Sequence, residues 1–436
     1  MRTLLCNFNV LTSFQNPPER RSLLIEEGLI DTVFPSTEGD DRRELSAERY
    51  DRKIDGEGRL LVPGLVNAHT HMGMTLLRGY ADDMKLDRWL QDWIWPAEEK
   101  LTGEEVYWAS LLGMIESLRS GVTAFADMYF YMNEVAKATE RIGMRGLLSY
   151  GIIAEEMDQG GQRELGEALQ LAERWGGEGR IEIALSPHAP YTCGDEVLQV
   201  VAEEAKTRGL PIHIHLAETA GEVEDSLQKY DMTPARRLEK LGIFESPVLA
   251  AHCVHLRGED FRILSQEDVA VVHNPTSNMK LSSGAAPVDR LLAEGATVAL
   301  GTDGTASNNN LDMFKEIKLA SLLQKLETDD PVSLPAPQAF ELATLGGASA
   351  LGLDQTGKIE EGYRADLVAL NTQGPHWTPK HSLTSNLVYS AHATDVEMVM
   401  IDGEIVLEGG EILTVDEEEV ISRVAELSEK YGKDRS

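Results

Sequence analysis

The 436-residue sequence contains few cysteines and no long apolar run. Its three cysteines, Cys6, Cys193 and Cys253, are an odd number without CxxC spacing, which argues against a disulfide framework or a thiolate zinc site and favours the reducing cytoplasm. No stretch reaches the roughly 18 apolar residues of a membrane-spanning helix. Polar residues interrupt positions 1–14, where a secretory signal would need an unbroken apolar segment. We therefore expect no membrane partner and no export.

Positive charge is also scarce. The chain has 73 acidic and 40 basic residues, a formal net charge of −33, which excludes the cationic surface that nucleic-acid binding requires. The acidic residues are spread along the chain, in stretches such as 38–41, 222–225 and 416–419. This distribution predicts a hydrated acidic surface, typical of proteins that stay dispersed in concentrated salt, and hence a halophilic source.

With 42% hydrophobic residues, the chain can fill a large core. Segments rich in β-forming residues alternate with amphipathic helical patterns such as 107–120, 134–142, 196–208 and 259–266. Such alternation indicates a parallel α/β sheet, and eight units indicate a closed (β/α)₈ TIM-type barrel. The eight predicted strands are 60–71, 122–128, 145–152, 181–188, 211–217, 248–255, 269–274 and 297–303.

The two ends of the chain have a different pattern, with short β-like segments separated by turn signals. We expect residues 1–60 and 356–436 to form together a small composite β-sandwich into which the barrel, residues 61–355, is inserted. Residues 417–430 predict a terminal helix. The β-like segments are 1–11, 367–370, 396–401 and 404–407.

Histidines fall at the carboxyl ends of the predicted barrel strands, where barrel enzymes place their active sites. A lone histidine is more often a core or surface residue, but five imidazoles and a carboxylate on one rim would be costly to bury without a metal. A set rich in nitrogen with one carboxylate suits Zn²⁺, with Fe²⁺ as the alternative. These residues are His69, His71, His188, His215, His252 and Asp303.

A metal of this kind lowers the pKa of bound water to about 7 and so provides a nucleophile at neutral pH. Asp303 can coordinate the metal and accept a proton from the water. Glu218, three residues after His215, can carry protons between the water and a ring nitrogen, provided that a closed pocket raises its pKa. The alternative for Glu218 is a simple acid at a helix N-terminus.

Several motifs resemble the amidohydrolase superfamily: PGLVNAHTH (63–71), IHIHLAET (212–219), HNPTSN (273–278), GTDGTASNN (301–309) and GKIEEGYRADLV (357–368). The chain is most similar to the methylthioadenosine/S-adenosylhomocysteine deaminase branch, which includes 5′-deoxyadenosine deaminases and lies near the triazine chlorohydrolases. The resemblance implies a hydrolytic deaminase that converts the adenine of 5′-modified adenosines to hypoxanthine and releases ammonia. It also implies one metal ion per subunit and a homo-oligomer.

The same resemblance implies roles for individual residues. It makes Glu218 the proton shuttle, His252 a hydrogen-bond partner of the metal-bound water, His188 a substrate contact and Glu98 the acid that binds the ribose hydroxyls. The residues that match the metal ligands are His69, His71, His215 and Asp303.

Two parts of the expected substrate pocket match the family less closely. Tyr150 stands where some relatives have an arginine, and Arg163 is the candidate for a second substrate arginine. The loss of one cation favours methylthioadenosine or 5′-deoxyadenosine over the carboxylate-bearing S-adenosylhomocysteine. Trp89, Trp93 and Trp95 either form a lid over the substrate or pack beneath their loop.

Other functions stay open. A dinuclear hydantoinase-like enzyme would carry a lysine at the end of the fourth strand, where this chain has Ser186–Pro–His188. Guanine, cytosine or a chlorinated triazine could replace adenine as the reacting ring. An inactive metal-binding protein is the non-enzymatic alternative. His213 and His273 are expected to support the site or the core and not to bind metal.

Overall fold

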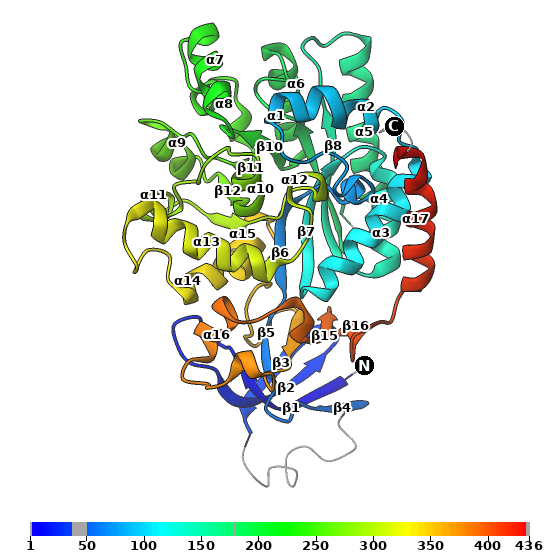
Figure 1. The fold of residues 1–436 in the computed structure, drawn as a ribbon, viewed down its shortest axis with the longest axis vertical. Helices are drawn as coiled ribbons and strands as arrows, with labels where there is room; N and C mark the ends of the chain where they lie inside the picture. The colour runs from blue at the N-terminus through cyan, green and yellow to red at the C-terminus, as the bar shows by residue number, and fades with distance from the viewer. Residues whose placement is uncertain (1, 37–49, 178, 433–436) are drawn as a thin grey trace.

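The computed structural model describes residues 2–36, 50–177 and 179–432 (Figure 1). Eight parallel strands follow one another in chain order, each hydrogen-bonded to the next, and helices lie between them. The expected fold class is confirmed: a TIM-type barrel joined to a sheet domain built from both termini. The barrel strands are β6 (Leu65–Thr70), β7 (Val122–Tyr129), β8 (Arg145–Ile152), β9 (Ile181–Pro187), β10 (Ile212–Leu216), β11 (Val248–His252), β12 (Ala270–His273) and β13 (Val298–Leu300).

Side chains help to join the first barrel strand to the last. The Asn67 side-chain amide donates to Thr302 Oγ1 at 2.8 Å, and its carbonyl oxygen accepts from the Thr302 backbone N–H at 3.0 Å. An asparagine side chain has one donor and one acceptor group, so it can substitute for a backbone ladder position. Beyond it the Asp303 backbone N–H donates to the His69 carbonyl at 3.0 Å. This closure places Asp303 beside His69.

Small side chains fill the barrel interior on the amino-terminal side of the histidines. Ala68, Ala126, Ala184 and Ala299 belong to one buried cluster that also contains Leu351, from the segment after the last barrel helices. The other face of each barrel strand packs against the surrounding helices, so that strands such as β6, β7 and β10 are buried along their whole length.

The helices form the outer layer of the barrel (Figure 1). No helix in the described part of the chain is long and apolar enough to cross a membrane. The longer helices are α3 (Gly103–Arg119), α4 (Met132–Ile142), α5 (Gln159–Trp175), α6 (Asp195–Arg208), α7 (Ala220–Tyr230) and α13 (Met313–Thr328). The shorter ones are α1 (Leu86–Trp89), α2 (Trp95–Glu98), α8 (Pro234–Lys240), α9 (Asp260–Gln266), α10 (Pro275–Lys280), α11 (Val288–Ala293), α12 (Thr305–Asn308), α14 (Ala336–Glu341) and α15 (Gly347–Ala350).

Both ends of the chain contribute to a second, mixed sheet with its own buried apolar cluster. Its strand order within the described residues is β17-β16-β15-β14-β5-β1-β2-β3, with β4 also paired to β1. The strands are β1 (Arg2–Val10), β2 (Glu19–Glu26), β3 (Leu29–Pro35), β4 (Arg52–Asp55), β5 (Leu60–Pro63), β14 (Leu367–Leu370), β15 (Val396–Ile401), β16 (Glu404–Glu408) and β17 (Glu411–Ile412).

The predicted strand 60–71 is in fact two strands, β5 in the mixed sheet and β6 in the barrel. The break is at Gly64, whose backbone N–H donates to the Asp366 carbonyl at 2.8 Å. A Cβ at this position would collide with the Thr123 side chain. A glycine is therefore needed where the chain passes from one sheet to the other.

Ion pairs and a returning helix connect the two parts of the molecule. Arg145 of β8 binds Asp366, with 2.6 Å between Nε and Oδ2, and also pairs with Asp402. After α16 (Leu383–Tyr389) and the last strands, α17 (Glu417–Gly432) runs back along α3, as Figure 1 shows. The Tyr431 ring near its end contacts Tyr80, with 6.3 Å between centroids.

Candidate metal centre and active site

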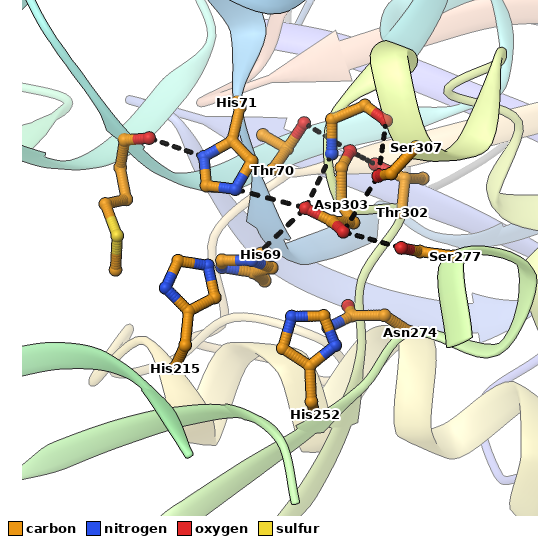
Figure 2. A network of polar contacts seen from close by, with 12 residues as sticks. His69, Thr70, His71, His215, His252, Asn274, Ser277, Thr302, Asp303 and Ser307 are labelled. Atoms are coloured by element: carbon orange, nitrogen blue, oxygen red, sulfur yellow. Dashed lines mark hydrogen bonds and ion pairs between the residues drawn. The ribbon is translucent and has the colours of Figure 1, made fainter. Parts of the chain in front are cut away.

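Two histidines at the end of β6 meet the carboxylate that follows β13 (Figure 2). His71 Nε2 lies 3.1 Å from Asp303 Oδ1, and His69 Nε2 lies 3.5 Å from the same oxygen. The other ring nitrogen of His71 donates to the Met128 carbonyl at 2.5 Å, which fixes the ring with Nε2 toward Asp303. The three side chains are buried and close enough for one metal ion.

His215 and His252 come from the next part of the rim, at the ends of β10 and β11. Their rings are stacked, with centroids 5.5 Å apart, and together with His69 they make a second group that could hold a metal. His215 Nδ1 donates to the His188 carbonyl at 2.8 Å, so Nε2 is the nitrogen left for the site. His252 has φ +74, an unusual conformation for a residue with a Cβ, at the point where β11 ends.

The donor set fits a divalent metal. The buried His69 Nε2 has no hydrogen-bond partner among the described residues, as expected of an atom whose partner is an ion. Burial lowers the pKa of His69 to about 4 and also lowers that of His215, so both rings are neutral and free to bind metal. Burial opposes protonation of His71 too, but Asp303 outweighs it and raises the pKa to about 9. A bound cation would take the place of that proton.

The carboxylate of Asp303 is held by residues to which the motifs alone assigned no role. Ser277 and Ser307 donate to Oδ2 at 2.6 and 2.9 Å, and the Gly304 backbone N–H donates to Oδ1 at 2.8 Å. Asn278 contacts His252, with 2.8 Å between Oδ1 and Nδ1. Ser277 and Asn278 belong to the HNPTSN motif at the end of the seventh strand. Their place in that motif is the sequence feature that could have identified them as site residues.

Glu218 lies just after the strand that carries His215 and points into the same buried space. Its Oε1 accepts from Ser283 Oγ at 3.1 Å, and its Oε2 lies 3.9 Å from His252 Nε2. Burial raises the pKa of this carboxyl, and the nearby Asp303 adds to the effect. Glu218 also precedes the N-cap of α7, which is Thr219. Burial thus favours the protonated form of Glu218 more than water would.

A pocket opens above these residues. Glu98 lines it from α2, and His188 lines it from the end of β9. Burial raises the pKa of Glu98 to about 7, although Tyr129 and His71 oppose the rise, and its Oε1 is buried without a partner among the described residues. Burial lowers the pKa of His188 to about 3, which keeps its ring neutral.

Tyr150 and Arg163 do not line this pocket. They line an adjoining hollow, and four residues line both spaces: Trp95, Glu98, Phe130 and Ile153. The three tryptophans also occupy different positions. Trp89 and Trp95 line the pocket, whereas Trp93 packs against Tyr80 with 5.9 Å between ring centroids. Packing describes Trp93, and a lid role for Trp89 and Trp95 stays a prediction.

The acidic stretches also differ from one another. Glu222, expected on a hydrated surface, is buried and accepts two backbone hydrogen bonds from the turn that carries Glu218. Glu222 therefore contacts the backbone of this turn and not the solvent. Glu418 and Glu419 are exposed as expected. Stretch 38–41 lies outside the described residues.

His213 and His273 are both fully buried. His213 Nε2 lies 2.8 Å from His69 Nδ1, so His213 contacts a candidate ligand at the ring nitrogen that does not face Asp303. Neither ring nitrogen of His273 has a hydrogen-bond partner among the described residues.

Comparison with known proteins agrees with this architecture. The chain is 47% identical to the 5-methylthioadenosine/S-adenosylhomocysteine deaminase of Syntrophomonas wolfei, over 99% of each chain. It is 49% identical to the 5′-deoxyadenosine deaminase of Methanothermobacter thermautotrophicus, over 94% of each. Its fold is similar to the crystal structure, with bound zinc, of an adenosine deaminase from Xanthomonas campestris, at a TM-score of 0.92 and 34% identity over 99% of this chain and 98% of the other. A sequence model of the amidohydrolase family matches residues 60–406, and this chain belongs to that family.

Proposed function

We propose that this chain is a hydrolytic deaminase that converts the adenine of 5′-modified adenosines to hypoxanthine and releases ammonia. Two relatives with this kind of activity in their names match almost its full length. The observation that carries the proposal is the position of Glu218: a buried carboxyl of raised pKa, next to a cluster of metal-binding side chains and in the same pocket as Glu98. In this arrangement Glu218 can exchange protons with the adenine ring while Glu98 binds the ribose.

The proposed metal ligands are His69, His71, His215 and Asp303, with Zn²⁺ as the expected ion and Fe²⁺ as the alternative. A metal in this position supplies a nucleophile from water at neutral pH. The chain's own part is to hold the ligands rigidly, through the Met128 and His188 carbonyls and the two serines on Asp303.

Proton transfer falls to Glu218 in this proposal. Protonated Glu218 donates to N1 of the adenine ring, which makes C6 more electrophilic toward the attacking water. The Glu218 carboxylate then accepts a proton from that water as the C6–O bond forms and passes it to the exocyclic amine, so that the C6–N bond breaks and ammonia leaves. Neutral His188 contacts the adenine ring. His252 orients the reacting water through Nε2, because its Nδ1 is bound to Asn278. The Glu98 carboxylate accepts hydrogen bonds from the two ribose hydroxyls.

The hollow beside the pocket bears on the 5′ substituent. Five carboxylates line it, and Arg163 is the one cationic side chain among its described lining residues. Tyr150 adds a hydroxyl but no charge. Since the carboxylate of S-adenosylhomocysteine would meet one cation among five carboxylates there, we expect methylthioadenosine and 5′-deoxyadenosine to be better substrates than S-adenosylhomocysteine.

The direct test follows the ultraviolet shift from adenine to hypoxanthine. Methylthioadenosine, 5′-deoxyadenosine, S-adenosylhomocysteine and adenosine are offered to purified protein, before and after treatment with a chelator and after restoration of zinc. We expect turnover that the chelator removes and zinc restores, with S-adenosylhomocysteine ranked below the first two. Absence of turnover with all four, from folded and metal-loaded protein, would refute the adenine specificity and direct attention to guanine, cytosine and triazines.

A single substitution tests the role of Glu218. Glu218→Gln keeps the shape of the side chain but cannot carry a proton, so kcat should fall by about 100-fold or more while metal content and nucleoside affinity are retained. Glu224→Gln, an exposed acid on α7, is the matched control. Retained turnover in Glu218→Gln would exclude the shuttle role.

We further propose that the enzyme acts in the cytoplasm and forms a homo-oligomer. The first expectation follows from its cysteine content and the second from its family resemblance. Analytical ultracentrifugation tests the oligomer directly, since a single species of about 48 kDa would contradict it.

A further inference from the structure

The turn between His215 and Glu218 has to orient two side chains of the site at once. Strand β10 ends at Leu216, and Ala217 then adopts φ +49, in the left-handed region that residues with a Cβ rarely occupy. A turn of this kind persists only when its surroundings hold it in place. The contacts of Ala217 therefore decide where the Glu218 carboxyl lies.

The carbonyl side of the turn is held by the neighbouring strand. The backbone N–H groups of Val254 and His255, just after β11, donate to the Ala217 carbonyl at 3.0 and 2.9 Å. These contacts fix the position of the Ala217 carbonyl but leave the N–H groups of Ala217 and Glu218 still to be satisfied.

The side chain of Glu222 satisfies both of those N–H groups. Its Oε1 accepts from the Ala217 N–H at 2.9 Å, and its Oε2 accepts from the Glu218 N–H at 2.8 Å. Glu222 is the third residue of α7, where an ordinary capping box would bind the N-cap residue Thr219. Here the carboxylate reaches past Thr219 to the two residues before it. Thr219 Oγ1 in turn accepts from the Glu222 N–H at 3.2 Å, which completes the first turn of the helix.

We propose that Glu222 is a positioning residue for catalysis: its carboxylate, bound to the N–H groups of Ala217 and Glu218, holds the Glu218 carboxyl in the pocket. The inference rests on the proposed role of Glu218 as the proton shuttle. Buried at 8% exposure and bidentate, Glu222 has the rigidity that the role requires. With its backbone held in this way, the Glu218 side chain is fixed further by the hydrogen bond that its Oε1 accepts from Ser283.

Glu222→Gln tests this with minimal change of volume. The amide can accept one of the two N–H groups, but its NH₂ then faces the other donor, so one bond to the turn is lost. We expect kcat to fall by about 10–100-fold with KM changed by less than about threefold, because the defect lies in the placement of the proton shuttle and not in nucleoside binding. Bound metal should stay at the wild-type level.

Thr219→Ala is the matched control. It removes the N-cap bond of the same helix but leaves the Glu222 carboxylate on the turn, so it should lower the melting temperature and leave kcat within about twofold of wild type. A loss of kcat in Thr219→Ala as large as that in Glu222→Gln would overturn the proposal, since it would trace the effect to helix stability. A kcat of Glu222→Gln within twofold of wild type would overturn it as well.

Amide hydrogen exchange provides a readout that does not depend on the substrate. The Ala217 and Glu218 amides should exchange faster in Glu222→Gln than in wild type, and at the wild-type rate in Thr219→Ala. Unchanged exchange in Glu222→Gln would refute the positioning contact, whatever the activity. If wild-type protein fails to deaminate any adenosine, the proposed function is wrong, while the exchange experiment still decides whether Glu222 holds the turn.

Discussion

His69 Nδ1 lies 2.8 Å from His213 Nε2, and this contact determines which nitrogen His69 offers to the metal site. If His69 Nε2 binds the ion, Nδ1 must carry the hydrogen and donate it to His213. His213 Nδ1 then faces Ser149 Oγ at 3.4 Å, and the serine hydroxyl donates to the Asp127 carbonyl at 2.9 Å. A chain of three buried side chains thus fixes the tautomer of a proposed ligand.

Loss of this chain should weaken metal binding. We predict that His213→Ala lowers the affinity for zinc by about 10–100-fold, since a ligand histidine loses the partner that orients it. Competition with a chromophoric chelator measures the change. His273→Ala is the control, because it removes an equally buried ring whose nitrogens have no hydrogen-bond partner among the described residues. Equal affinities in wild type and His213→Ala would show that the contact does not support the metal.

The role of Glu98 can be separated from general effects on the pocket by the choice of nucleoside. Glu98→Gln should raise the KM for adenosine by roughly 10-fold or more, because a hydrogen bond to a charged acceptor contributes about 1.5–3 kcal/mol. The KM for 2′,3′-dideoxyadenosine, which lacks both hydroxyls, should change little. Glu140→Gln, an exposed acid of α4 that does not line the pocket or the hollow beside it, should leave both values unchanged. A KM that rises equally for both nucleosides would exclude ribose recognition by Glu98.

Stability should depend on pH through Glu316 of α13, which is fully buried and accepts hydrogen bonds from Thr276 and Asn308. Burial raises its pKa from 4.5 to about 7, despite these bonds. Since the folded state then binds the proton more tightly than the unfolded chain, the contribution of Glu316 to the free energy of unfolding is greatest below pH 4.5 and falls as pH rises toward 7. The contribution is at most about 3 kcal/mol.

Glu316→Gln removes this titration. We predict that the difference in the free energy of unfolding between pH 5 and pH 8, measured by chemical denaturation, is smaller in Glu316→Gln than in wild type. Glu327→Gln, an exposed acid on the same helix, should keep the wild-type difference. A larger difference in Glu316→Gln would show that the folded state does not raise the pKa of Glu316.

The acidic composition predicts a response to salt. With a formal charge of −33, repulsion between surface carboxylates should destabilise the folded chain at low ionic strength. Raising KCl from about 0.1 to about 2 M shortens the screening length from about 10 Å to below about 3 Å, so the melting temperature should rise. A melting temperature that does not change with salt would count against a halophilic origin.

Much of the fold could be predicted because barrel strands are apolar on both faces and are separated by amphipathic helices. The seven barrel strands after the first begin within one residue of their predicted starts. Strands β2, β3 and β4 were missed because they carry mixed polar patterns. Strands β2 and β3 form hairpins with their sequence neighbours, whereas β4 pairs with the more distant β1. The break at Gly64 was missed as well, although Pro63–Gly64 is a turn signal, because apolar residues continue on both sides of it.

For the site, the sequence determined the chemistry: which strand ends carry imidazoles, and which carboxyl group follows His215. How these groups meet depends on contacts made in the folded chain. The Asn67–Thr302 contact brings Asp303 to His69 from the opposite end of the barrel sequence. His252 reaches the site because of its φ of +74, and Glu222 is buried because the turn before it has two N–H groups to satisfy. These outcomes depend on hydrogen bonds between segments far apart in the chain or on strained backbone, neither of which local residue patterns specify.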